Sequence, residues 1–172
     1  MSQLERRGGK ALLDSVLARV AGEAGEALRT GAVVTGGWYP ADWYDALLAA
    51  VEAEYPGQPA AIRTLTREAV VEDFRTLFKI LRLVVSPNAA LHNGVKVMAR
   101  YWEGGRVSLS EARTGYVHFV FDDFVGFTPR IVEDVVGGIE AVVDMMGVTR
   151  APLDVRPAAD PKRFEVIIRY SI

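Results

Sequence analysis

The chain has 172 residues, 50% of them hydrophobic and 24% charged, with a formal net charge of −2. This composition is typical of one globular domain with its own core, and the slightly acidic balance gives no electrostatic drive toward nucleic acid. Because the chain contains no cysteine, disulfides, thiolate catalysis and zinc–sulfur sites are excluded.

The expected location is the cytoplasm. A chain without cysteine fits a reducing compartment, and the polar stretch MSQLERRGGK at its start lacks the apolar run of a signal peptide. No stretch approaches the roughly 20 apolar residues of a membrane helix. We therefore expect no membrane insertion.

The first part of the chain is predicted to be helical. Residues 1–9 are expected to be a flexible start, and apolar residues then recur at helical spacing over residues 10–29. A helix of about 14 residues is predicted from Pro40, because proline fits the first helical turn. The longest apolar stripe covers residues 62–85. A further helix is predicted over residues 86–103, where a capping serine precedes a proline.

The pattern changes after this helical part. Residues 106–112 and 116–122 are predicted to be strands joined by the turn RTGY, because alternating apolar residues flank a glycine turn. A helix is predicted over residues 128–146, and two final strands near residues 152–156 and 163–170.

This order predicts an α+β fold, in which an N-terminal helical layer is followed by a β-β-α-β-β antiparallel sheet unit. We expect a single domain over residues 1–172, with the helical part at 10–105 and the sheet part at 106–172.

Two glycines interrupt the helix predicted over residues 128–146. Gly137 and Gly138 each cost about 1 kcal/mol relative to alanine inside a helix. Two explanations stay open. Either the helix closely approaches the sheet or another helix, or the bare backbone leaves room for a ligand or for a side chain of a partner.

Four large aromatic residues lie within seven positions: Trp38, Tyr39, Trp43 and Tyr44. Such rings either seal the seam between the N-terminal helix and the rest of the chain, or line an interior pocket or a partner groove. Tyrosine and tryptophan suit both tasks, because they are bulky and carry one polar group.

The polar residues of the second strand do not indicate catalysis. His118 is a lone strand histidine, for which a hydrogen-bonded structural role is expected. Asp122 and Asp123 are adjacent and point to opposite faces of a strand, so they are unsuited to sharing a metal ion. A role in ending the strand is expected for them, and we predict that the chain is not an enzyme.

Two resemblances add to this reading. The segment GGWYPADWYDALLAAVEAEYPG at residues 36–57, followed by LFKILRLVVSP, resembles an uncharacterised paralogous family of myxobacteria over roughly residues 30–170. The order of helices and strands resembles the haem-nitric-oxide/oxygen-binding fold and its relatives, the 4-vinyl-reductase-like small-molecule sensors. The resemblance implies a sensor-like fold.

The resemblance also has consequences for haem. In the haem-binding members a helix histidine supplies the iron ligand, and a Tyr-x-Ser-x-Arg motif holds the propionates. Here the resemblance places His92 of ALHNG at the ligand position, and Phe119, Phe121 and Asp123 at the motif positions. An aspartate repels a propionate by roughly 1–4 kcal/mol at short range. No cofactor is therefore expected.

Together these arguments predict a non-enzymatic signalling or protein-interaction module, with a protein partner and self-association as a homodimer. The alternative is a sensor of a small apolar ligand held between the helical layer and the sheet, with haem binding through His92 as a third reading. The residues expected to line or fill a ligand site are Trp38, Tyr39, Trp43, Phe78, Phe119 and Phe121.

Overall fold

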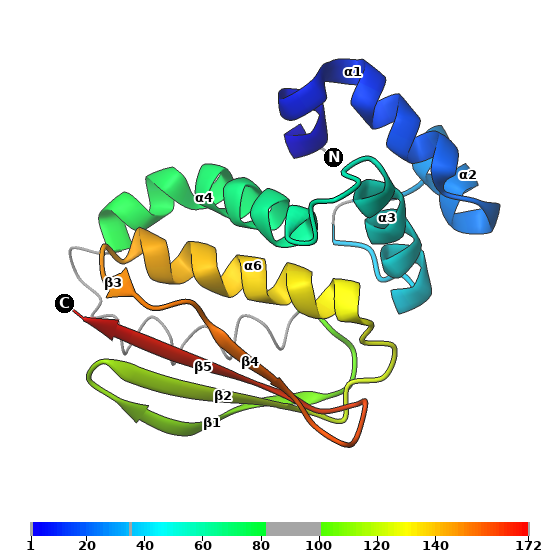
Figure 1. The fold of residues 1–172 in the computed structure, drawn as a ribbon. Helices are drawn as coiled ribbons and strands as arrows, with labels where there is room; N and C mark the ends of the chain where they lie inside the picture. The colour runs from blue at the N-terminus through cyan, green and yellow to red at the C-terminus, as the bar shows by residue number, and fades with distance from the viewer. Residues whose placement is uncertain (1, 35, 82–100, 172) are drawn as a thin grey trace. The chain divides into compact units, whose positions relative to one another are not determined.

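In the computed structural model, helices form the first part of the chain and an antiparallel sheet dominates the second (Figure 1). The structure describes residues 2–34, 36–81 and 101–171, without the side chains of Ser2 and of residues 74–81. The helix predicted over residues 86–103 lies almost wholly outside the described residues.

The described helices are α1 Ser2–Arg19, α2 Gly22–Thr30, α3 Ala41–Ala53, α4 Ala61–Leu81 and α6 Pro129–Met145. The strands are β1 Arg106–Arg113, β2 Tyr116–Asp122, β3 Thr149–Arg150, β4 Asp154–Pro157 and β5 Phe164–Ser171. The predicted α+β order is confirmed, with the two-residue strand β3 as an addition.

One helix boundary was missed. The prediction of a continuous helix over residues 10–29 is wrong, because α1 ends at Arg19 and α2 begins at Gly22. The Arg29 guanidinium of α2 donates hydrogen bonds to the carbonyls of Leu17 and Val20, at 2.9 and 3.0 Å. These bonds satisfy carbonyls that the end of α1 leaves open. Both helices bury apolar residues in one cluster, so the apolar period continues across the turn and hides it.

The start of α1 is attached to α4. The helix is interrupted at Gly8 and Gly9, and the turn before them buries Leu4 in a hydrophobic cluster. Gln3 donates to Glu68 at 2.9 Å, and Arg7 donates to both oxygens of the same carboxylate, at 2.9 and 2.7 Å. Residues 2–7 thus form a helical segment held by Glu68.

The sheet is antiparallel throughout. Its order is β1-β2-β5-β3, and β4 also pairs with β5. Because β2 occupies one edge of β5, the short strands β3 and β4 follow one another along its other edge. The predicted hairpin turn is confirmed, since Arg113 pairs with Tyr116 on either side of Thr114-Gly115. One register shift lies between Leu109 and Glu111 of β1.

The chain divides into two compact units. Unit 1 comprises Met1–Ala69 and Thr128–Gly137, and unit 2 comprises Val70–Phe127 and Gly138–Ile172. The first half of α6 therefore belongs to unit 1 and its second half to unit 2.

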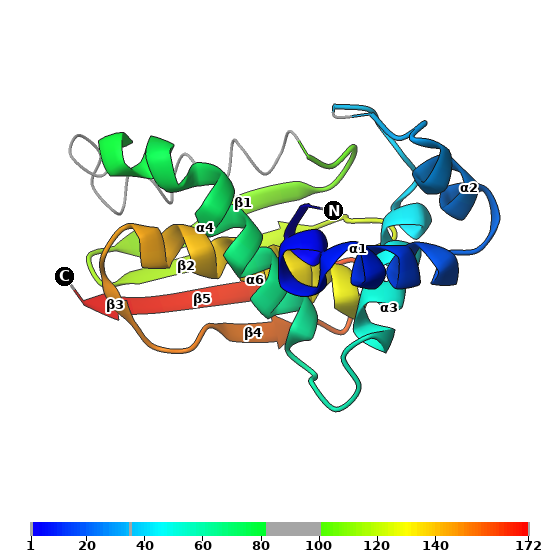
Figure 2. The ribbon, with the colours of Figure 1, turned by 90° about the horizontal axis from the view of Figure 1, so that it is seen from above.

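Each unit has its own core. In unit 1, α1, α2, α3 and the start of α4 bury one apolar cluster: Leu4, Val16, Val20, Ala24, Ala50, Val51 and Leu65. In unit 2, the second half of α6 lies over one face of the sheet (Figures 1 and 2). The buried residues there include Val117, Phe119, Phe121, Ile139, Val143, Phe164, Val166 and Ile168.

The two glycines of α6 differ in their surroundings. A Cβ built at Gly137 would lie 2.5 Å from the carbonyl oxygen of Arg63 in α4, within unit 1. Close approach to another helix therefore explains this glycine, as one of the two sequence-based explanations predicted. A Cβ at Gly138 would meet no atom within 4 Å among the residues that the structure describes.

Candidate functional site

Strand β2 carries the positions at which the resemblance expects a haem-propionate motif. Phe119 and Phe121 are both buried and lie two positions apart in the strand, so their side chains point to the same face of the sheet. The Phe121 ring stacks on Phe164 of the paired strand β5, with centroids 4.2 Å apart and planes 10° from parallel. Both motif positions are thus occupied by core side chains without a hydroxyl group.

More aromatic rings continue this packing. Phe124 lies at a tilt to both Phe121 and Phe127, with centroids 6.0 and 4.5 Å apart. Phe127 in turn contacts Trp102, with centroids 4.7 Å apart. The cluster of Trp102, Phe121, Phe124, Phe127 and Phe164 was missed from the sequence, because its members come from four separate segments.

The third motif position has the wrong charge for a propionate. Strand β2 ends at Asp122, and Asp123 follows in a left-handed conformation with φ 61° and an exposed side chain. The predicted strand-ending role of the two aspartates is confirmed. A propionate needs hydroxyl or cationic donors, whereas these positions supply two phenyl rings and a carboxylate. The described residues of the motif therefore do not fit haem.

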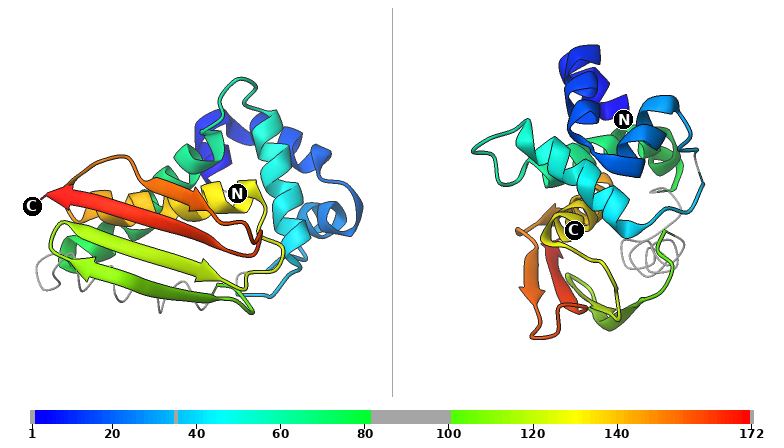
Figure 3. Two further views of the ribbon diagram at one scale, coloured as in Figure 1. Left: turned by 60° about the horizontal axis from the view of Figure 1, so that its bottom comes forward. Right: turned by 90° about the vertical axis from the view of Figure 1, so that its right-hand side faces the viewer.

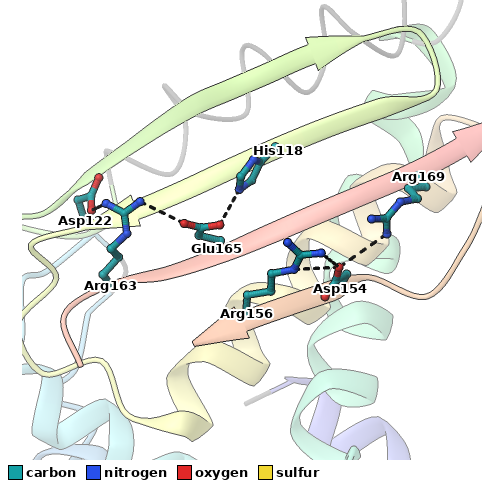
Figure 4. A network of polar contacts seen from close by, with 7 residues as sticks. All are labelled: His118, Asp122, Asp154, Arg156, Arg163, Glu165 and Arg169. Carbon is teal, nitrogen blue, oxygen red and sulfur yellow. Dashed lines mark hydrogen bonds and ion pairs between the residues drawn. The ribbon is translucent and has the colours of Figure 1, made fainter. Parts of the chain in front are cut away.

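The opposite face of the sheet carries an ordered chain of charges (Figure 4). His118 Nε2 lies 2.9 Å from Glu165 Oε2, and Arg163 donates to the other oxygen of Glu165 at 3.1 Å. Arg163 also donates to Asp122 at 2.8 Å. Hydrogen bonds from Arg163 and then from His118 lower the pKa of Glu165 below its ordinary value. His118 is thus hydrogen-bonded, as a structural strand histidine is expected to be.

A second group of charges lies on β4 and β5 of the same face (Figure 4). Arg156 donates to Asp154 at 2.7 Å, and Arg169 lies 3.7 Å from the same oxygen. The side chains of Arg156 and Arg169 are about half exposed, and ion pairs between exposed side chains add little to stability. In Figure 3 the sheet is seen with this face toward the viewer and the second half of α6 lies behind it, so the ion pairs are on the side of the sheet away from that half-helix.

The aromatic segment of unit 1 shows a division of roles. Trp43 is partly buried against the hydrophobic cluster. Tyr39 stacks on Trp43, with centroids 6.0 Å apart and planes 20° from parallel. Trp38 is 61% exposed and Tyr39 38% exposed. Trp43 therefore packs as the first explanation predicted, whereas Trp38 faces solvent.

A polar cluster of unit 1 was missed from the sequence. Asp134 of α6 accepts a hydrogen bond from Thr66 of α4 and another from Tyr44 of α3. Burial raises the pKa of Asp134 above its ordinary value, while the two hydroxyl donors oppose that shift. Burial, with Asp134 nearby, raises the pKa of Tyr44 well above its ordinary value. No periodicity reveals this cluster, since three helices contribute one residue each.

Two ion pairs flank this cluster within unit 1. Arg63 donates to both oxygens of Glu133, each at 2.8 Å. Arg130 donates to the two oxygens of Asp45 at 3.1 and 3.0 Å, and Thr128 donates to the same carboxylate. Although burial acts in the opposite direction, these bonds lower the pKa of Asp45. The first turns of α6 are thereby fixed to α3 and α4.

The remaining sequence-based candidates fall outside this description. His92 lies outside the described residues, and so does the side chain of Phe78. Among the described residues, Trp38, Tyr39 and Trp43 belong to unit 1, while Phe119 and Phe121 belong to unit 2.

No group of three or more acidic, histidine or cysteine side chains in the described part of the chain is placed to hold a metal ion. None of the described helices is long and apolar enough to cross a membrane.

The order of elements defines the chain as a member of one α+β fold, that of the haem-nitric-oxide/oxygen-binding (H-NOX) proteins, and this confirms the resemblance at the level of fold. An H-NOX protein from K. algicida, solved in its Fe(II) unliganded state, is 12% identical, with a TM-score of 0.64 over 99% of this chain and 92% of that one. An oxygen-binding H-NOX domain related to soluble guanylate cyclases is 13% identical, with a TM-score of 0.64 over 99% and 90% of the two chains. An H-NOX protein from S. oneidensis in the Fe(II)NO state is 9% identical, with a TM-score of 0.61 over 99% and 94%.

The similarity is one of fold alone at these identities. No protein-family model matches the sequence. No curated protein matches it either.

Proposed function

We propose that this chain is a non-enzymatic signalling module, which uses the H-NOX-like fold for protein–protein interaction and works without haem. The chemistry of β2 is the observation that supports this proposal. Phe119 and Phe121 fill a core where the resemblance expects hydroxyl donors, and Asp123 places a carboxylate where it expects a cation. A fold that keeps its shape but not these donors suits a sensor-derived scaffold.

The described polar residues support a non-catalytic role. His118 is the one histidine among them, and its Nε2 contacts the carboxylate of Glu165 on the charged face of the sheet. General acid–base work needs a substrate position within hydrogen-bond reach and an environment that tunes the group. The pair instead lies within a chain of surface ion pairs that includes Arg163.

A haem titration tests the proposal. We expect hemin added to the purified full chain to give no stoichiometric, saturable Soret band, and we expect His92→Ala to behave like the natural chain. A saturable band that His92→Ala abolishes would show haem binding and would overturn the proposal.

Native mass spectrometry of the same preparation addresses the alternative. We expect the mass of the polypeptide and its oligomers alone. An organic mass that co-purifies in a fixed ratio and is lost on denaturation would instead favour a sensor of a small apolar ligand.

A further inference from the structure

The start of α1 forms a short segment of its own. Residues 2–7 form helical turns that lie at an angle to the rest of the helix (Figure 1), because the backbone between the two parts is not helical. Gly8 has φ −135°, and Gly9 has φ 65°, a left-handed value that glycine adopts without strain. We call residues 2–7 the N-terminal strap and Gly8-Gly9 its hinge.

One side chain attaches the strap to the hydrophobic cluster of unit 1. Leu4 is the only apolar residue of the strap, and it is 6% exposed. It belongs to the same cluster as Leu65 of α4, whereas its neighbours Glu5 and Arg6 are exposed. The strap therefore covers part of the cluster with a single buried leucine.

One carboxylate supplies the polar attachment. Glu68 of α4 accepts hydrogen bonds from Gln3 Nε2 at 2.9 Å and from Arg7 Nε and Nη2 at 2.9 and 2.7 Å. Gln3, Leu4 and Arg7 share one face of the strap, since they lie three and four positions apart along helical turns. Glu68 likewise follows Leu65 by one turn of α4. The apolar and polar attachments thus join one face of the strap to one face of α4.

Glu68 is the main polar partner of the strap. Its hydrogen bond to Arg7 is the largest cause that raises the pKa of Arg7 above its ordinary value, and a contact of Arg7 with Tyr55 is a smaller cause. The same hydrogen bond lowers the pKa of Glu68. The carboxylate is therefore ionised and the guanidinium charged at neutral pH, so the pair holds the strap as an ion pair.

These attachments are few for the segment that they order. Closing the strap fixes the backbone and side chains of residues 2–7, which costs conformational entropy at every position. Opposing this cost are one buried leucine and one ion pair whose side chains are each 36% exposed, and ion pairs at such sites add little to stability. Removal of either attachment should therefore release the strap, while the rest of unit 1 keeps its own contacts.

We propose that the N-terminal strap is a hinged cover, which opens at Gly8-Gly9 and uncovers part of the hydrophobic cluster of unit 1, with Glu68 as the residue that holds it closed. Unit 1 stays folded when the strap opens, because the later part of α1 and helices α2, α3 and α4 supply the other members of the cluster. This device does not depend on the proposed function. The experiments below report only on the strap, so their failure is distinct from a positive haem or ligand result.

Limited proteolysis of the full chain with trypsin measures the opening. Trypsin cleaves after arginine, and Arg6 and Arg7 lie at the end of the strap next to its hinge. Cleavage of a transiently opened segment follows the equilibrium population of the open form. We expect Glu68→Gln, which leaves both cleavage sites intact, to speed cleavage there about 3-fold or more. Leu4→Ala should speed it about 10-fold or more.

Glu72→Gln is the matched control. It makes the same change one turn further along α4, at an exposed residue, and we expect it to leave cleavage of the strap unchanged. Cleavage after Arg19, at the end of α1, reports on unit 1 itself. We expect its rate to stay that of the natural chain in all three variants.

Several results overturn the proposal. Fast cleavage after Arg6 and Arg7 in the natural chain would show that the strap is not closed. A natural rate in Glu68→Gln or in Leu4→Ala would show that the changed residue does not hold it. Equal acceleration in Glu72→Gln would remove the specific role of Glu68, and equal acceleration after Arg19 would show that unit 1 opens as a whole.

Dye binding tests whether opening uncovers the cluster. Leu4→Asp places a charge that cannot stay among apolar side chains, so it should open the strap fully. We expect this variant to bind more anilinonaphthalene sulfonate, a dye that reports exposed apolar surface, than Arg6→Asp, which introduces the same residue at an exposed position of the strap. Equal dye fluorescence, or loss of helical circular dichroism in Leu4→Asp, contradicts a cover that opens on a folded unit.

Discussion

Replacing the two glycines of α6 one at a time separates close packing from helix propensity. Inside a helix, alanine is more favourable than glycine by about 1 kcal/mol, and this difference applies at both positions. At Gly137 the new Cβ would lie 2.5 Å from the carbonyl oxygen of Arg63 and 3.1 Å from its carbonyl carbon. At Gly138 it would meet no described atom within 4 Å. Both substitutions therefore gain the same helix propensity, and they differ only in the contact that the new Cβ makes with Arg63 at position 137.

The magnitude follows from the nature of the contacting atoms. Arg63 presents backbone, which is held in α4 and cannot rotate away as a flexible side chain would. Overpacking of this kind costs about 1–3 kcal/mol. Because the propensity gain cancels between the two variants, Gly137→Ala is expected to be about 1–3 kcal/mol less stable than Gly138→Ala.

Thermal unfolding followed by circular dichroism measures this difference. A free-energy change of 1 kcal/mol moves Tm by about 2–4 °C in a chain of this size, so Gly137→Ala should melt about 2–12 °C below Gly138→Ala. If Gly137→Ala melts at or above the Tm of Gly138→Ala, the close approach of α6 to α4 does not explain this glycine, and the reasoning is refuted.

Two further substitutions test the buried groups of each unit. The folded-state pKa of Asp134 is raised above the ordinary value of 3.8, so its contribution to stability is present at low pH and is lost as pH rises through the raised pKa. Asp134→Asn keeps an oxygen that accepts from Thr66 and has no charge, so its unfolding free energy relative to the natural chain should increase as the pH rises above about 4, the ordinary pKa of an aspartate. Urea titrations at several pH values measure this, and a pH-independent difference contradicts the expected shift. Phe121→Ala removes a fully buried ring stacked on Phe164 and should destabilise unit 2 by about 3–5 kcal/mol. Urea unfolding of the variant measures that loss, and a change below about 1 kcal/mol would show that the ring is not part of a close-packed core.

The strands were predicted more reliably than the helix ends. Alternating apolar residues and the turn RTGY place β1 and β2 within one residue of their observed ends. Alternation is a local property, because a strand with one buried face shows it in its own sequence. The break between α1 and α2 escaped the same reasoning, because Val20 continues the apolar period across the turn.

The residues of the candidate site also differ in whether their local sequence predicts their roles. A local pattern predicted the roles of His118 and of the two aspartates that end β2, and the neighbours of each residue in the strand were enough to assign them. The cluster around Asp134 was not predictable, because its donors Thr66 and Tyr44 are 68 and 90 positions away. Nothing in the sequence near Asp134 distinguishes it from an ordinary exposed helix carboxylate.

The sequence by itself determined the α+β class, the antiparallel hairpin, the absence of cysteine chemistry and the phenyl rings at the motif positions of β2. These depend on residue type and on spacing along the chain. Only the tertiary structure decided that Gly137 faces the backbone of Arg63, that Asp134 is held by two hydroxyl groups, and that Trp38 faces solvent while Trp43 packs. The physical reason is that burial and desolvation depend on which distant segments surround a side chain, and one-dimensional spacing does not contain that information.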